Sequence, residues 1–354
     1  MLKKLMPAAV SLSVLLPSGN VYAHSFADAI EQAEKSVCLV EFQSKGPSKE
    51  IEGPKEYKQP ENQEDPFKDF FNKNQDSSNS LGSCFVVSVN NKKYIVTNEH
   101  VVDSKEKNSR PYIFFHNDLK KYPAKVLGAD EVSDLAVLEM SNSDGKEKLN
   151  KIDPLTLGNS DKVRKGDQVF AIGHPVGQKW TVTQGIVSAT KKRSTNTWQE
   201  VIQSDVSINQ GNSGGPLFNE NGEVVGVNSF IISPQGGNIG INFSVTSNNV
   251  NYIINTLITD GKVERGRLGI AFVVDDDLGK IIIEEIQKDG PVDKTGKLKK
   301  NDILLKINGR DINFPADIGL AMDTVKPNQK VELEVLRGKK TIKLVVKTGL
   351  FVFD

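Results

Sequence analysis

The sequence predicts a mainly β protein with a large first domain and a smaller α/β second domain. Short apolar runs separated by turn residues fill the chain from about residue 81 to 245. Many short strands at this spacing are typical of an all-β barrel or sandwich. A helical pattern follows at 247–257, and mixed strand and helix patterns follow that. At 354 residues the chain exceeds one typical domain and is long enough to bury a sizeable core.

The first 23 residues differ in character from the rest. Lys3 and Lys4 make a positive start, residues 5–16 are an apolar run, and Ala23 ends the segment with a small side chain. This pattern predicts a cleavable signal peptide at 1–23 and a mature protein exported to a bacterial periplasm. The run is short for a bilayer span. An anchor that stays uncleaved is the alternative, and no other stretch could cross a membrane.

A short amphipathic segment at 27–37 leads into the first strand, within 36–42. Residues 45–80 then form a long polar interruption that cannot bury a core of its own. It carries three aromatic residues, at 67, 70 and 71. These side chains could dock on their own domain, or they could clasp a neighbouring subunit.

The further strands of the first domain follow in order. They are expected at 84–89, 93–97, 112–116, 124–127, 135–140, 168–172, 181–187, 201–204, 223–227 and 241–245. Gly261 is placed to end the helix at 247–257, so a domain boundary is expected near 261–265.

The second domain should contain strands at 280–286 and 302–307 and a helix at 315–325. Apolar residues then alternate at 331–335 and 342–346 on either side of a hairpin turn at 337–340.

Composition excludes several classes of function. The chain has 45 basic and 45 acidic residues, so nothing suggests a nucleic acid or membrane surface bound through bulk charge. Two cysteines without C-x-x-C spacing, and only four histidines, make a metal site improbable. Cys38 and Cys84 both lie in strand-like runs. They could form a disulfide in an oxidising compartment, or remain two buried thiols.

The chemistry centres on Ser213, in the Gly-rich loop 208–217. Such a loop can be a bare turn, but His100 and Asp134 precede it in the order His, Asp, Ser. A serine hydroxyl becomes a nucleophile when an imidazole accepts its proton and a buried carboxylate orients that imidazole. The backbone N–H groups of Gly211 and Ser213 could stabilise the oxyanion. The expected activity is therefore that of a serine protease.

Several motifs in register strengthen this interpretation. The motifs lie at 82–85, 97–101, 133–138, 171–177, 183–188, 202–205 and 211–215. The sequence at these motifs resembles the HtrA (Deg) family of stress proteases, and the resemblance extends from about residue 36 to 347.

The resemblance implies a two-barrel trypsin-like serine protease domain at 24–262, followed by a small α/β PDZ domain at 266–348. It implies ATP-independent cleavage of unfolded or damaged exported proteins, without a cofactor. Assembly as homotrimers, or as larger cages of trimers, is also implied. The loop at 45–80 is similar to the family's long loop in the first barrel, which favours the clasp interpretation.

In the second domain, the resemblance assigns a peptide-carboxylate loop to Arg267, Leu268, Gly269 and Ile270. A bound peptide C-terminus would pair with the sheet edge at 270–274. Ile318 and Met322, one helical turn apart, could line the pocket for its last side chain or belong to the core.

The segment 228–245 resembles the family's specificity loop. Ile239 and Ile241 would make the substrate pocket small and apolar, which predicts cleavage after Val, Ile or Ala. The sequence departs from the family pattern at Cys84, Glu99, His174 and Gln210, and none of these departures removes a catalytic group.

Two other functions remain open at this point. The chain could be a peptide-binding holdase chaperone built on a protease scaffold. It could also be a regulatory, site-specific protease that senses C-terminal peptides.

Overall fold

The structure is a computed structural model that describes residues 26–43, 79–102, 110–174, 180–193, 200–209, 211–231, 239–275 and 279–351. The expected signal peptide at 1–23 lies outside this range. So does the expected polar loop, except for residues 79 and 80, which open a strand. Among the described residues, no helix combines the length and the apolar character that a bilayer span needs.

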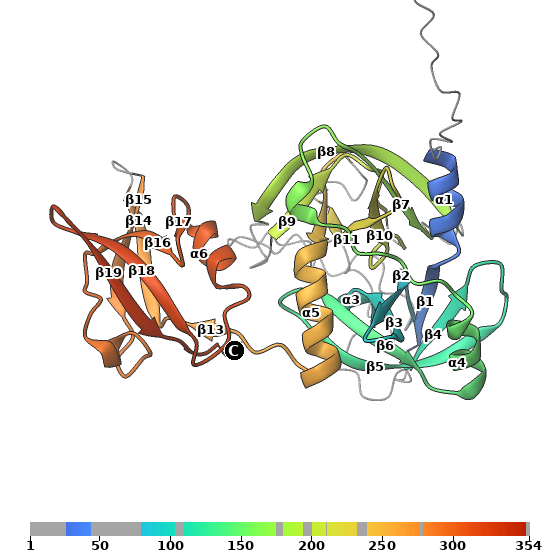
Figure 1. The fold of residues 1–354 in the computed structure, drawn as a ribbon, viewed down its shortest axis with the longest axis horizontal. Helices are drawn as coiled ribbons and strands as arrows, with labels where there is room; N and C mark the ends of the chain where they lie inside the picture. The colour runs from blue at the N-terminus through green and yellow to red at the C-terminus, as the bar shows by residue number, and fades with distance from the viewer. Residues whose placement is uncertain are drawn as a thin grey trace, which may run out of the picture.

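Two closed six-stranded barrels form the first domain, side by side in Figure 1. The first has the strand order β1-β2-β3-β6-β5-β4 and the second β10-β11-β12-β9-β8-β7. The strands of the first barrel are β1 (Val37–Gln43), β2 (Asn79–Val89), β3 (Lys92–Thr97), β4 (Arg110–Phe115), β5 (Lys121–Asp130) and β6 (Leu135–Met140). Those of the second are β7 (Gln168–Gly173), β8 (Thr181–Arg193), β9 (Glu200–Ser204), β10 (Pro216–Asn219), β11 (Val224–Ile231) and β12 (Asn242–Thr246).

A shared apolar core joins the two barrels. Phe85 and Val96 of the first barrel belong to the same buried cluster as Phe170 and Phe218 of the second. The rings of Phe170 and Phe218 stack with their centroids 4.7 Å apart. The two barrels are therefore fixed against each other along their junction.

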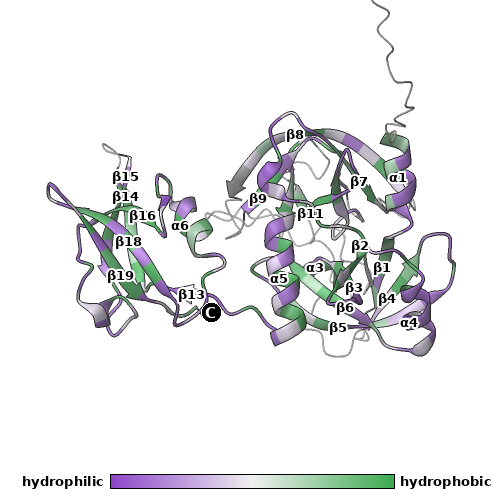
Figure 2. Ribbon diagram, in the orientation of Figure 1, coloured by the Kyte–Doolittle hydropathy of each residue, from purple (hydrophilic) through white to green (hydrophobic). Residues whose placement is uncertain are grey.

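Helix α5 (Ser247–Asp260) packs across both barrels, against β5 and β6 on one side and β11 and β12 on the other. Val250, Ile253, Ile254 and Leu257 are buried, while the exposed positions of the helix are polar (Figure 2). Gly261 ends the helix with φ of 74°, a left-handed conformation that glycine adopts at little cost. The expected helix and its stop are confirmed.

Cys38 and Cys84 form a disulfide between β1 and β2, with their Cα atoms 4.8 Å apart. They are directly opposite each other in the antiparallel pairing of the two strands. The free-thiol alternative is therefore wrong for this structure.

The second domain is one sheet of strand order β14-β15-β16-β18-β19, with β17 (Arg310–Asp311) paired to β16. The strands are β14 (Ile270–Asp275), β15 (Lys280–Ile286), β16 (Ile303–Ile307), β18 (Lys330–Arg337) and β19 (Lys340–Lys347). A small ribbon of β13 (Gly266–Arg267) and β20 (Gly349–Leu350) closes its base. Strand β14 is an edge strand of this sheet.

Some expected boundaries are wrong. Helix α1 (Phe26–Glu34) ends before residue 37, where β1 already begins. Helix α6 (Pro315–Met322) ends three residues short of 325, with Asp323 as its C-cap. Strand β10 and the short helices α3 (Glu99–Val102) and α4 (Ser143–Asn150) were not expected; neither were the single turns η1 (Ser160–Lys162) and η3 (Asp293–Thr295).

Candidate active site

His100 and Asp134 meet in the first barrel. His100 lies on α3, which the buried Val101 and Val102 hold against the barrel. Asp134 lies in the turn between β5 and β6, with φ of 51°. Its Oδ1 is 2.7 Å from His100 Nδ1, and it also accepts a hydrogen bond of 3.1 Å from the His100 backbone N–H. Asp134 is 5% exposed. This contact favours a proton on Nδ1 and leaves Nε2 as the nitrogen that can accept a proton.

Two further residues hold Asp134, and neither was expected from the sequence. Ser229 Oγ donates to Asp134 Oδ2 at 2.5 Å, and Asn98 Nδ2 donates to the Asp134 carbonyl at 2.7 Å. Ser229 lies in β11, inside the segment assigned to the specificity loop. A single serine or asparagine carries no spacing signal. The position of Asn98, two residues before His100, is the one sequence feature that could have indicated its role.

Ser213 belongs to the second barrel and approaches the same place. Its Oγ lies 3.5 Å from the Ser229 carbonyl, so Ser229 contacts both Ser213 and Asp134. At the junction of the barrels, Ser229 therefore links Ser213 to Asp134, which in turn contacts His100. Ser213 is 4% exposed.

The loop that carries Gly211 and Ser213 is tied to its surroundings through its backbone. The N–H of Gly214 donates to the Asn228 carbonyl, and the N–H of Asn228 donates to the Gly215 carbonyl, both at 2.9 Å. Gly214 has φ of 81°, and a Cβ there would collide with Thr97 Oγ1 and the Ser83 carbonyl. Glycine thus lets this loop dock directly onto the first barrel.

Of the two residues expected in the substrate pocket, Ile239 is 55% exposed. Ile241 packs against Val201, Phe230 and Phe243. The rings of Phe230 and Phe243 stack with their centroids 4.9 Å apart. Both residues lie just before the start of β12 in the chain.

The expected peptide-carboxylate loop borders a pocket of about 460 Å³. Arg267, Leu268, Gly269 and Ile270 all line it, and Gly269 has φ of 73°. Ile318 and Met322 of α6 line the same pocket and also belong to the buried cluster of the second domain. Ile318 and Met322 are therefore both pocket residues and core residues.

A buried charge cluster joins the two domains beside this pocket. Arg265 donates two hydrogen bonds to the Asp130 carboxylate, at 2.7 and 2.8 Å, and its Nε is 3.6 Å from Asp323 at the end of α6. Asp323 also accepts a hydrogen bond from Asn249 of α5. Burial raises the pKa of Asp323 from 3.8 to about 6.

The pocket of the second domain also has a wall residue from the first domain. This residue is Val132, two residues before Asp134.

No group of three or more His, Cys, Asp or Glu side chains in the described part of the chain could hold a metal ion.

Comparison with known proteins agrees with this geometry. The sequence profile of the trypsin-like peptidase domain matches residues 82–227, and that of the PDZ domain matches 266–348. A probable periplasmic serine endoprotease, DegP-like, from Pseudomonas putida is 35% identical over 93% of this chain and 70% of its own length. The periplasmic pH-dependent serine endoprotease DegQ of Escherichia coli is 36% identical over 75% of this chain.

This chain spans 58% of the length of DegQ and 54% of a DegP-like relative from Chlamydia pneumoniae. Among solved structures, the HtrA-type protease AlgW with a tripeptide superposes with a TM-score of 0.71 at 27% identity, over 93% of this chain and 98% of that one. The chain therefore belongs to the family of HtrA-type, DegP-like periplasmic serine endoproteases, with a trypsin-like domain followed by a PDZ domain.

Proposed function

We propose that the protein is an ATP-independent serine endopeptidase that cleaves unfolded or damaged exported proteins. Ser213 Oγ attacks the substrate carbonyl while His100 Nε2 accepts its proton. His100 then gives that proton to the leaving amine, and water repeats the sequence to release the acyl group. Asp134 orients the imidazole, and the N–H groups of Gly211 and Ser213 stabilise the oxyanion.

The observation that carries this proposal is the 2.7 Å contact between His100 Nδ1 and the buried Asp134 carboxylate, with Ser213 linked to that carboxylate through Ser229. A non-enzymatic scaffold has no need for a buried carboxylate aimed at an imidazole. The arrangement therefore favours catalysis over the holdase alternative.

For substrate selection, we assign the small apolar pocket to Ile239 and Ile241, so cleavage follows Val, Ile or Ala. A cleavage profile dominated by Lys or Arg would contradict this assignment. The substrate enters as an extended strand, which explains the need for unfolded polypeptide.

The PDZ domain, in this proposal, binds peptide C-termini ending in an apolar residue. Strand β14 lies at the sheet edge, so a peptide can add a further strand there while the loop at 267–270 captures its carboxylate. The apolar walls supplied by Leu268, Ile318 and Met322 suit an apolar last side chain.

A second function, regulatory cleavage switched on by such peptides, is favoured by one observation. Val132 lines the peptide pocket and lies in the same turn as Asp134. A bound peptide can therefore contact the segment that orients His100.

Processing and assembly complete the proposal. Residues 1–23 act as a cleaved signal peptide, residues 24–262 form the protease domain, and the mature protein works in the periplasm as a homotrimer or a larger assembly of trimers. The periplasmic names of the relatives support the compartment.

The test compares the mature protein with its Ser213→Ala variant on an unfolded, disulfide-free protein substrate. Cleavage is followed with and without peptides ending in apolar residues. We expect Ser213→Ala to abolish cleavage and the peptides to increase it in the unaltered protein. If neither form cleaves with any peptide, while both suppress substrate aggregation, the holdase alternative is correct.

A further inference from the structure

We propose that Ser83 and His174 are positioning residues that hold the oxyanion loop, residues 211–215, in its active shape. This inference rests on the proposed roles of Gly211 and Ser213 as oxyanion donors. Neither Ser83 nor His174 touches the reacting atoms, so both would act through the loop.

Ser83 contacts the two residues whose N–H groups are assigned to the oxyanion. Its Oγ donates to the Gly211 carbonyl at 2.7 Å, and its backbone N–H donates to the Ser213 carbonyl at 2.8 Å. Thr97 Oγ1 in turn donates to the Ser83 carbonyl at 2.8 Å. One residue of the first barrel thus holds both ends of the segment 211–213 from the second barrel.

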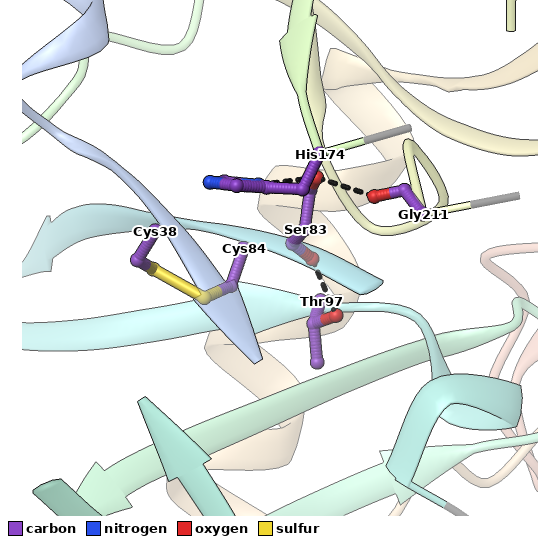
Figure 3. Close-up of a disulfide and its surroundings, with 6 residues drawn as sticks. All are labelled: Cys38, Ser83, Cys84, Thr97, His174 and Gly211. Carbon is purple, nitrogen blue, oxygen red and sulfur yellow. Dashed lines mark hydrogen bonds between the residues drawn. A yellow bond between two sulfur atoms is a disulfide. The ribbon is translucent and has the colours of Figure 1, made fainter. Parts of the chain in front are cut away.

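His174 completes the arrangement. Its Nδ1 is 3.1 Å from Ser83 Oγ, and Figure 3 shows the His174 ring, the Ser83 hydroxyl and the Gly211 carbonyl in a row. A serine hydroxyl has one hydrogen, and the shorter contact assigns it to the Gly211 carbonyl. Nδ1 must then be the donor to Ser83 Oγ, so the geometry assigns the Nδ1–H form of His174.

The Ser83 and His174 side chains have little room to move. Ser83 is fully buried and His174 is 1% exposed. A Cβ at Gly173 would lie 3.0 Å from Ser83 Oγ and would collide with the Asn212 side chain, so only glycine allows this approach. The Trp180 ring packs edge-on against the imidazole, with centroids 4.5 Å apart.

Gly211 needs such a restraint more than other residues. Its φ is 102°, and a glycine backbone rotates with little steric resistance. A rotation at Gly211 would turn its N–H away from the oxyanion. Ser83 holds the carbonyl of Gly211 itself and that of Ser213, which limits that rotation. A displacement of about 1 Å at such a site can cost about 100-fold in rate.

The test uses four single variants of the full chain and the Ser83→Ala/His174→Gln double variant on a peptide substrate, with kcat and KM measured separately. Ser83→Ala removes the hydroxyl. His174→Gln places its amide near the position of Nε2, whereas His174→Asn keeps a donor near the position of Nδ1. Ser36→Ala is the matched control, because it also deletes a buried hydroxyl that donates to a carbonyl, that of Asp153.

We expect Ser83→Ala and His174→Gln each to lower kcat about 10- to 100-fold with KM nearly unchanged, because the loss falls on the transition state. The double variant should be no worse than either single one, since the residues act as a unit. His174→Asn should keep kcat within about threefold of the unaltered protein, although it packs less well against Trp180. Ser36→Ala should leave kcat unchanged.

The inference fails if His174→Asn is as slow as His174→Gln, or if Ser36→Ala loses as much kcat as Ser83→Ala. If Ser83 and His174 only stabilise the fold, kcat should follow thermal stability across the variants. Such a correlation would also overturn the inference. Ser213→Ala separates the proposals, since cleavage that survives this variant refutes the proposed nucleophile.

A second measurement does not depend on activity. Nitrogen-15 NMR of histidine-labelled protein, with the His174 signals assigned from their loss in His174→Asn, should show the Nδ1–H form. An Nε2–H form would refute the assigned hydrogen bonds even if the protein proves inactive.

Discussion

Replacing Asp323 with Asn should raise the stability of the protein at neutral pH, with an effect that disappears in acid. Asp323 lies at the contact between the two domains and is 7% exposed. Desolvation raises its pKa, while Arg265 acts in the opposite direction; Asp130 and Glu200 add to the rise. The folded protein therefore binds the proton more tightly than the unfolded chain does.

The sign of the effect follows from this difference. Since the folded pKa is about 6 and the unfolded value is 3.8, the contribution of Asp323 to stability is fully present below pH 3.8 and is lost as pH rises through 6. A shift of this size corresponds to a loss of roughly 3 kcal/mol above pH 7. Asn resembles the protonated acid and keeps one acceptor for Asn249, so Asp323→Asn should avoid most of that loss.

Chemical denaturation of both proteins between pH 4 and 8, followed by circular dichroism, measures the difference in the free energy of unfolding. We expect the variant's advantage to grow from near zero at pH 4 to about 2–3 kcal/mol at pH 7. The exposed Asp289→Asn is the control and should shift stability by less than about 0.5 kcal/mol. An advantage that stays constant with pH, or a variant less stable at pH 7, would refute the argument.

Three further perturbations have defined outcomes. Replacing Cys38 and Cys84 together with Ala should lower the free energy of unfolding by about 2–4 kcal/mol, because their disulfide closes a loop with a sequence separation of 46; unchanged urea midpoints would contradict this. Ser229→Ala should lower kcat by roughly 10-fold with little change in KM, since the buried Asp134 carboxylate loses a donor; an unchanged kcat would exclude that role. Arg267→Gln should weaken binding of a fluorescent peptide by about 10-fold in low salt and by less in high salt, and a C-terminally amidated peptide should show no difference between the two proteins.

The barrel strands could be predicted from the sequence because each one is an apolar run bounded by turn residues. Strand β10 could not, since Pro216–Asn219 is short and directly follows the Gly-rich loop, where turn residues dominate the pattern. Helix α3 was hidden for a related reason: four residues carry too little periodicity to distinguish a helical turn from the end of β3.

The proposed catalytic groups were identifiable because their chemistry requires particular residue types in a particular order. His100, Asp134 and Ser213 have few substitutes, and the chain has only four histidines to choose from. Ser229 and Ser83 differ in this respect. Each matters through a hydroxyl aimed at one atom across the barrel junction, and a hydroxyl in a strand gives no sequence signal of where it points.

His174 is of a residue type that draws attention in a sequence, but its position in the structure could not be predicted from the sequence. The sequence marked it only as a departure from the family pattern in a turn-like segment. The structure buries it against Ser83, where the single hydrogen of the serine hydroxyl decides which imidazole nitrogen carries the proton. A residue type that usually attracts attention as an acid or base would here serve as a fixed donor. Its substitution by Asn tests that distinction more sharply than its removal, because the Asn amide retains the donor but cannot act as an acid or a base.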